Sequence, residues 1–143
     1  MKTILVVDDE CFLVKTLSVL LEIEGYRVVS AANGKDGLAQ LVKESPDLVL
    51  TDFMMPTADG LELIRGVHAL PDFRSLPMVM MSAARKGVAL PTRMVRVTVF
   101  LSKPFGLDEL LPIIERLIGK GEPQGRPPPV RSSDHGAATV GRL

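Results

Sequence analysis

The chain has 143 residues, of which 46% are hydrophobic and 24% charged, a balance typical of a globular domain with a full core. Its 17 basic and 17 acidic residues cancel, so net charge favours neither a nucleic-acid partner nor an acidic one. The single cysteine, Cys11, excludes an internal disulfide and fits a reducing cytoplasm. The first apolar run stops at Asp8-Asp9, too short for a signal peptide or a membrane span. We therefore expect a cytoplasmic protein with no membrane segment.

Short apolar runs alternate with helical patterns along the first 118 residues. The runs predict strands that are buried on both faces, and apolar residues spaced by three or four positions predict helices between them. Segment 83–96 contains Gly87 and Pro91, so any helix there is short or irregular. In chain order, the patterns predict a strand over 3–7, a helix over 12–24, a strand over 26–31, a helix that opens at Asn33-Gly34 and stops at Ser45-Pro46, a strand over 47–51, a loop over 52–59, a helix over 60–68, a loop over 71–76, strands over 77–81 and 97–102, and a helix over 107–118.

The alternation of strands and helices predicts an α/β fold with one parallel sheet covered by helices on both faces. Crossovers in such a sheet are right-handed, and ligands bind beyond the carboxyl ends of the strands. From Gly119 onward the composition changes to proline, glycine and charge, with few residues to bury. We therefore expect one domain over 1–118 and a disordered tail over 119–143.

Polar residues follow four of the five predicted strands. Asp8 and Asp9 follow the first strand, Asp52 the third, Ser82 the fourth and Lys103 the fifth. Because the carboxyl ends of parallel strands meet at one edge of a sheet, we expect these side chains to converge there. Three carboxylates held together repel one another, so the group requires the lysine and a bound cation.

This set of groups suits phosphoryl transfer. Carboxylates of Asp9 and Asp52, with a backbone carbonyl just after Asp52, provide the oxygen ligands that Mg²⁺ prefers. The Lys103 ammonium and the Ser82 hydroxyl are placed to stabilise charge on phosphoryl oxygens. A carboxylate can also accept the phosphoryl group as an acyl phosphate, and Asp52 is the best candidate because the other acids lie beside the expected metal.

The same residues form a set of motifs that resembles the receiver domain of two-component response regulators. The resemblance covers residues 1–118 and implies a flavodoxin-like (βα)5 fold, a doubly wound sheet of five parallel strands in the order 2-1-3-4-5. Because the implied chemistry is self-phosphorylation at one residue, we do not expect an enzyme. The motifs are Ile4-Leu5-Val6-Val7-Asp8-Asp9-Glu10, Asp52-Phe53-Met54-Met55-Pro56 with Asp59-Gly60, Ser82-Ala83, and Lys103-Pro104-Phe105.

The resemblance also implies roles for single residues. Asp52 would accept a phosphoryl group from the phosphohistidine of a histidine kinase, and Asp8, Asp9 and the Met54 carbonyl would organise Mg²⁺ with it. Ser82 and Lys103 would contact the phosphoryl oxygens. Ser82 and Phe100, three residues before the lysine, would move together on activation.

The expected partners follow from these roles. They are a histidine kinase or phosphotransfer protein, and a downstream protein that the sequence does not identify. We expect no nucleic-acid or membrane partner, and a monomer or weak homodimer.

Two alternatives use the same residues. A Mg²⁺-dependent phosphohydrolase with an aspartyl nucleophile usually has a second acid two residues after the nucleophile, where this chain has Met54. A receiver that binds partners without phosphorylation is disfavoured because every group needed for transfer is present.

Overall fold

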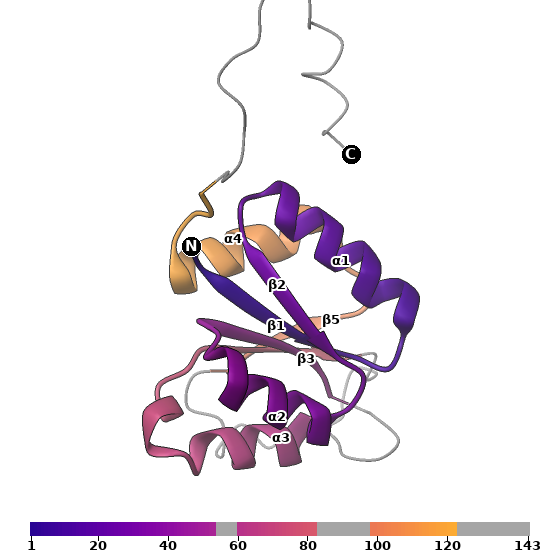
Figure 1. Cartoon of the computed structure of the whole chain (residues 1–143). Coiled ribbons are helices and arrows are strands. Elements are labelled where there is room, and N and C mark those ends of the chain that lie inside the picture. The colour runs from indigo at the N-terminus through magenta and orange to yellow at the C-terminus, as the bar shows by residue number, and fades with distance from the viewer. Residues whose placement is uncertain (54–59, 83–97, 123–143) are drawn as a thin grey trace, which may run out of the picture.

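The computed structural model describes residues 1–53, 60–82 and 98–122, which form one five-stranded parallel sheet with helices on both faces (Figure 1). The strand order is β2-β1-β3-β4-β5, as the resemblance implied. The elements are β1 (Thr3–Val7), α1 (Cys11–Ile23), β2 (Arg27–Ala31), α2 (Gly34–Glu44), β3 (Leu48–Asp52), α3 (Gly60–His68), the 3₁₀ helix η1 (Pro71–Phe73), β4 (Met78–Ser82), β5 (Thr98–Ser102) and α4 (Leu107–Ile118).

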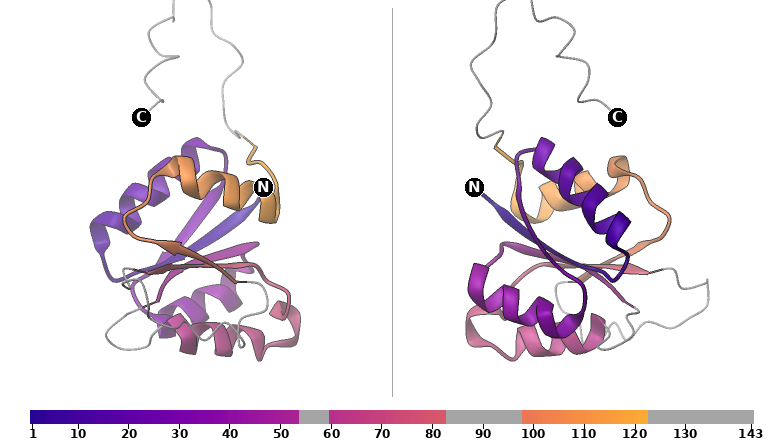
Figure 2. Two further views of the ribbon diagram at one scale, coloured as in Figure 1. Left: turned by 180° about the vertical axis from the view of Figure 1, so that it is seen from behind. Right: turned by 45° about the vertical axis from the view of Figure 1, so that its right-hand side comes forward.

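Helices α1 and α4 cover one face of the sheet, and α2 and α3 cover the other (Figure 2). Successive residues of β1 explain why its apolar run is unbroken. Ile4 and Val6 pack toward α1 and α4, whereas Leu5 and Val7 pack toward α2 and α3, and all four are fully buried. A strand in the middle of a two-faced sheet therefore has no solvent side for a polar residue.

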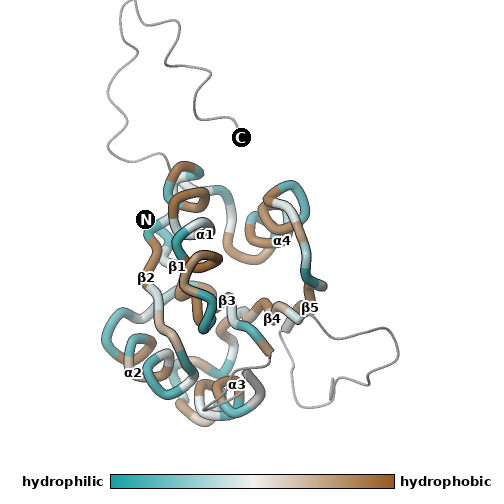
Figure 3. The backbone as a smooth tube through the Cα atoms, turned by 90° about the vertical axis from the view of Figure 1, so that its right-hand side faces the viewer, coloured by the Kyte–Doolittle hydropathy of each residue, from teal (hydrophilic) through white to brown (hydrophobic). Residues whose placement is uncertain are grey.

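The helices bury one side each, and their turns alternate between hydrophobic and hydrophilic colour in Figure 3. Leu17 and Leu21 are the buried residues of α1, and Leu110 and Ile114 are those of α4. Within the described residues, none of the helices combines the length and the apolar character that crossing a membrane requires.

The predicted elements agree with the structure except at a few boundaries. α1 begins at Cys11, one residue before the predicted start, and α4 has the predicted bounds, with Pro112 inside it. The stretch 71–76, expected to be loop, contains the short 3₁₀ helix η1, and its first residue is a proline whose backbone angle suits a helical start. The loop was expected over 52–59, but Asp52 is the last residue of β3. Residues 54–59 of that loop and the ambiguous segment 83–96 lie outside the described residues.

The chain after α4 packs against the turn between α1 and β2. The Tyr26 hydroxyl donates to the Gly119 carbonyl at 2.7 Å, and the Glu122 amide donates to the Gly25 carbonyl at 3.2 Å. Gly25 has a φ of 95°, and a Cβ there would lie 2.5 Å from the Glu122 backbone, so glycine is required on both grounds. Packed structure therefore extends to Glu122, four residues beyond the predicted domain boundary, while residues 123–143 lie outside the described part.

Candidate functional site

The carboxyl ends of the strands bring the predicted site residues together. Asp8 follows β1, Asp52 ends β3, Ser82 ends β4 and Lys103 follows β5. The Lys103 amide donates to the Ser82 carbonyl at 2.8 Å, which extends the pairing of β4 with β5 and fixes where the lysine side chain starts. The parallel register thus aligns residues that are far apart in the sequence.

The Lys103 ammonium is the centre of the site. Its Nζ lies 3.0 Å from Asp8 Oδ2, 3.5 Å from Asp52 Oδ1 and 3.4 Å from Glu10 Oε1. The exposed fraction of the lysine side chain is 15%, against 0% for Asp8 and 10% for Asp52. A single cation, shielded from solvent, is therefore shared among three carboxylates.

Asp8 is held rigidly by its neighbours. Its Oδ1 accepts the Glu10 backbone N–H at 2.9 Å and its Oδ2 accepts from Lys103. Because both oxygens have donors and the side chain is fully buried, Asp8 acts as a fixed negative charge that orients the lysine. Its oxygens are poorly placed to attack a group that arrives from solvent.

The surroundings of the site shift the pKa values of both Asp52 and Lys103. Burial and the nearby Asp8 charge raise the pKa of Asp52 above its usual value, although Lys103 opposes this shift. Burial alone would lower the pKa of Lys103, but the hydrogen bond that Lys103 donates to Asp8 and the charges of Asp8, Asp52 and Glu10 raise it overall. Lys103 therefore stays charged, while ionised Asp52 lacks a full countercharge.

Asp8, Asp9 and Asp52 have carboxylate oxygens within 4.8 Å of one another, and Asp9 is exposed. A donor set made only of oxygens, with an open side toward solvent, fits a small hard cation such as Mg²⁺. The Met54 carbonyl, which the resemblance added to the ligand set, lies outside the described residues. Ser82 is 5% exposed at the same edge of the sheet.

Phe100 lies in the middle of β5, opposite Met80 in the neighbouring strand. Its partly buried side chain packs against the apolar cluster between the sheet and α2–α3. The expected switch pair, Ser82 and Phe100, therefore comes from adjacent strands, and its movement remains a prediction.

Glu10 is the last residue of the first motif, but its place in the sequence indicated no role in the site. Its carboxylate reaches Lys103 although 65% of the side chain is exposed. The available signal was a third consecutive acid after Asp8 and Asp9. An exposed acid beside a strand is common, so only the position of the lysine gives it a role.

Comparison with known proteins gives a consistent result. A family model described as the response regulator receiver domain matches residues 4–115. The chain is 30% identical over 130 residues to the phosphate regulon transcriptional regulatory protein PhoB of Pseudomonas aeruginosa, which covers 90% of this chain and 57% of that protein. It is 32% identical to the protein PilG of the same organism, over 78% of this chain and 84% of PilG. The chain spans about half the length of several curated relatives that it matches.

Solved structures are similar over the same region. The chemotaxis protein CheY4 of Vibrio cholerae superimposes with a TM-score of 0.75 at 28% identity, over 82% of this chain and 99% of that one. The response regulator TrrA of Thermotoga maritima, solved in complex with Mg²⁺-BeF, has a TM-score of 0.72 at 29% identity, over 82% and 100% of the two chains.

Proposed function

Because the chain belongs to the response regulator receiver domain family of two-component systems, we propose that Asp52 accepts a phosphoryl group in a Mg²⁺-dependent reaction. The donor is the phosphohistidine of a histidine kinase or phosphotransfer protein. The observation that carries the proposal is the position of Lys103 Nζ, between buried Asp8 and more accessible Asp52 at the carboxyl edge of the sheet.

Accessibility selects Asp52 among the acids of the site. Asp8 is fully buried, and both of its carboxylate oxygens already accept hydrogen bonds. Asp9 is exposed, and among the described residues it makes no hydrogen bond with Lys103. Asp52 retains 10% exposure and has its Oδ1 3.5 Å from the ammonium. An Asp52 oxygen attacks phosphorus and forms the O–P bond. The N–P bond of the donor breaks, and the imidazole nitrogen keeps the electron pair.

The chain's own groups then stabilise the product. Lys103 neutralises charge on one phosphoryl oxygen, and the Ser82 hydroxyl donates to another. Lys103 can do this without leaving Asp8, because an ammonium has three N–H donors. The pKa shifts support this division of roles, since the ammonium is stabilised in its charged form.

In this proposal, Asp8, Asp9, Asp52 and the Met54 carbonyl would hold Mg²⁺. When bound, Mg²⁺ neutralises the carboxylates and the negative charge of the incoming phosphoryl group. Support comes from the oxygen-only donor set and from the Mg²⁺-BeF complex of the related TrrA.

Receiver domains are signalling modules rather than classical enzymes, and the output of this one is proposed to be phosphorylation-dependent protein binding or onward phosphotransfer. Ser82 and Phe100 lie on adjacent strands, so a shift of Ser82 toward the phosphoryl group can be transmitted to the Phe100 side chain. The family match does not favour the phosphohydrolase alternative.

Phosphorylation of the intact chain by acetyl phosphate and Mg²⁺, followed by mass spectrometry, tests the proposal. The wild type should gain the mass of one phosphoryl group, and Asp52→Ala should gain none. Asp72→Ala is the matched control, because Asp72 is an exposed aspartate on η1 and should leave phosphorylation unchanged. An equal mass gain in Asp52→Ala would contradict the assignment.

A further inference from the structure

One edge of the sheet is open. β2 is an outermost strand and pairs only with β1 among the described residues. The Arg27 amide donates to Lys2 and the Ala31 carbonyl accepts from Asp8, so these two residues direct their backbone groups toward β1. Because these directions alternate along a strand, Val28 and Ser30 present their N–H and C=O groups to the outside.

This edge has little of the protection that exposed edges usually carry. Natural edge strands are commonly blocked by proline, by lysine or by a bulge. β2 contains none of these, and its one charged residue, Arg27, forms an ion pair with Glu44 at the beginning of the strand. Val28 and Val29 are only partly buried. The middle of the strand is therefore available for pairing.

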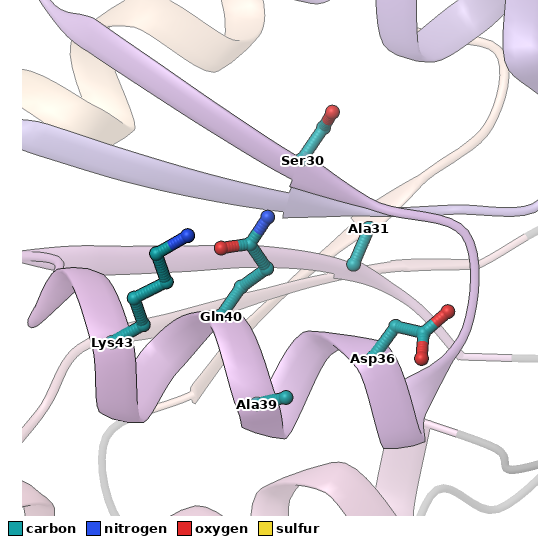
Figure 4. A pocket seen from close by; sticks show the side chains of 6 residues that line it. All are labelled: Ser30, Ala31, Asp36, Ala39, Gln40 and Lys43. Carbon is teal, nitrogen blue, oxygen red and sulfur yellow. The ribbon is translucent and has the colours of Figure 1, made fainter.

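A pocket of about 390 Å³ lies beside this edge (Figure 4). Ser30 and Ala31 of β2 line it on one side, and α2 provides the other side. The α2 residues follow one face of the helix, with an acid at one end, small or amide side chains in the middle, and a base at the other end: Asp36, Ala39, Gln40 and Lys43.

The charges on this face of α2 are complementary to the same charges on a second copy of the chain. Asp36 and Lys43 are about two helical turns, or roughly 10 Å, apart along α2. A second copy related by a two-fold axis between them would place its Lys43 opposite Asp36 and its Asp36 opposite Lys43. The same rotation makes the two β2 strands antiparallel, so their outward N–H and C=O groups can pair.

The spacing of the elements is compatible with this arrangement. Paired strands lie about 4.8 Å apart, and packed helices lie about 8–10 Å apart. α2 packs against both β1 and β2, so it lies close beneath the open edge. Joining two β2 edges therefore brings two α2 helices to about packing distance, and the small Ala39 side chain lies at the centre of the contact.

We propose that the outer edge of β2 and the adjoining face of α2 bind a second copy of this chain, forming a symmetric dimer with a continuous sheet across the two-fold axis. Asp36 and Lys43 determine the antiparallel alignment. The surface is separate from the phosphoacceptor site, so the dimer and the proposed phosphorylation can succeed or fail independently.

Sedimentation equilibrium of the full chain at low salt, over a range of protein concentrations, measures the association. The wild type should dimerise in a concentration-dependent way. Lys43→Asp and Asp36→Lys should each weaken self-association by at least about tenfold, because each places like charges opposite one another. An equimolar mixture of the two variants should form a heterodimer at least as strong as the wild-type dimer, since both pairs are then opposite in charge.

Lys35→Asp is the matched control, because Lys35 is exposed on the same helix but does not line the pocket. It should leave the dimer unchanged. Ser30→Pro removes one outward N–H and should weaken association, and circular dichroism verifies that each variant is folded. Asp36→Lys needs this check because Asp36 also accepts from the Asn33 side chain at 3.1 Å.

Three results would overturn the proposal: a wild type that stays monomeric to about 1 mM, a response of Lys43→Asp equal to that of Lys35→Asp, or failure of the two variants to associate when mixed. Either of the last two results would show that self-association does not use the Asp36 and Lys43 surface.

Discussion

The two ends of the sheet differ in how their charged and polar groups are paired. At the amino ends of the strands, polar groups are matched one to one. The Thr3 amide donates to Asp47 Oδ2 at 2.8 Å, the Asp47 amide returns a bond to the Thr3 carbonyl at 2.8 Å, and Arg27 pairs with Glu44. Asp47 and Glu44 each have their own donor, so these pairs contribute to stability without a ligand.

At the carboxyl ends, one ammonium serves several acids. Lys103 contacts Asp8, Glu10 and Asp52, while Asp9 adds a further carboxylate to the cluster. The negative excess is a cost to the isolated fold, and a bound cation would relieve it. Similar kinds of polar groups can therefore stabilise a fold or form a binding site, depending on how their charges are matched.

Removing the Lys103 ammonium should produce the largest effect. We expect Lys103→Met to lower the free energy of unfolding by about 3 kcal/mol at pH 7 without Mg²⁺, because fully buried Asp8 loses its countercharge. Phosphorylation should fall sharply in the same variant. Urea unfolding followed by circular dichroism measures the first effect, with exposed Lys35→Met as the control. A change in the free energy of unfolding below about 0.5 kcal/mol would mean that the buried acids at the carboxyl end do not depend on the lysine.

Removing one proposed metal ligand should have the next largest effect. We expect Asp9→Ala to weaken Mg²⁺ binding by at least about tenfold, or 1.4 kcal/mol, because one direct oxygen ligand is lost. Titration calorimetry measures the affinity, and Asp72→Ala should bind as the wild type does. Unchanged affinity in Asp9→Ala would remove this residue from the ligand set.

Matched changes of one aspartate at each end should have opposite signs. Without Mg²⁺ at pH 7, Asp52→Ala should stabilise the fold by about 1 kcal/mol, because it removes an acid whose charge is uncompensated. Asp47→Ala should destabilise it by about 1 kcal/mol, since the Thr3 amide loses its acceptor. Thermal or urea unfolding of both variants provides the test, and changes of the same sign would contradict the comparison.

The Asp52 effect should also depend on pH. The folded-state pKa of Asp52 is raised by burial and by Asp8, so the group binds protons more readily in the folded state. Its contribution favours folding below the unfolded-state pKa and is lost as pH rises through the folded-state pKa. The stability advantage of Asp52→Ala should therefore be present at pH 7 and shrink as the pH falls and Asp52 becomes protonated.

The smallest effect concerns the end of the chain. We propose that the domain ends at Glu122 and that residues 123–143 form a tail that is dispensable for folding. A chain that ends after Glu122 should melt within about 1 °C of the full chain, whereas one that ends after Ile118 should lose about 1 kcal/mol with the Tyr26–Gly119 hydrogen bond. Calorimetry distinguishes the two, and a large loss of stability in the chain that ends after Glu122 would show that the tail docks on the domain.

Much of the fold could be predicted from local sequence. The run Ile4 to Val7 indicates a strand covered on both faces, because no residue in it could face water. Parallel pairing then determines which ends meet, so the convergence of Asp8, Asp52 and Lys103 followed from their positions after strands. Segments 54–59 and 83–97 are not described, and predictions on Met54 stay untested.

By itself, the sequence determined the strands, most of the helix bounds and the composition of the site, because burial periodicity and strand ends are local properties. Only the tertiary structure decided which acids share the lysine, since Lys103 lies 95 residues from Asp8 and 93 from Glu10. The docking of Gly119 on Tyr26, also 93 residues apart, was decided in the same way. Such contacts depend on distances of a few ångströms between distant segments, and local patterns carry no information about them.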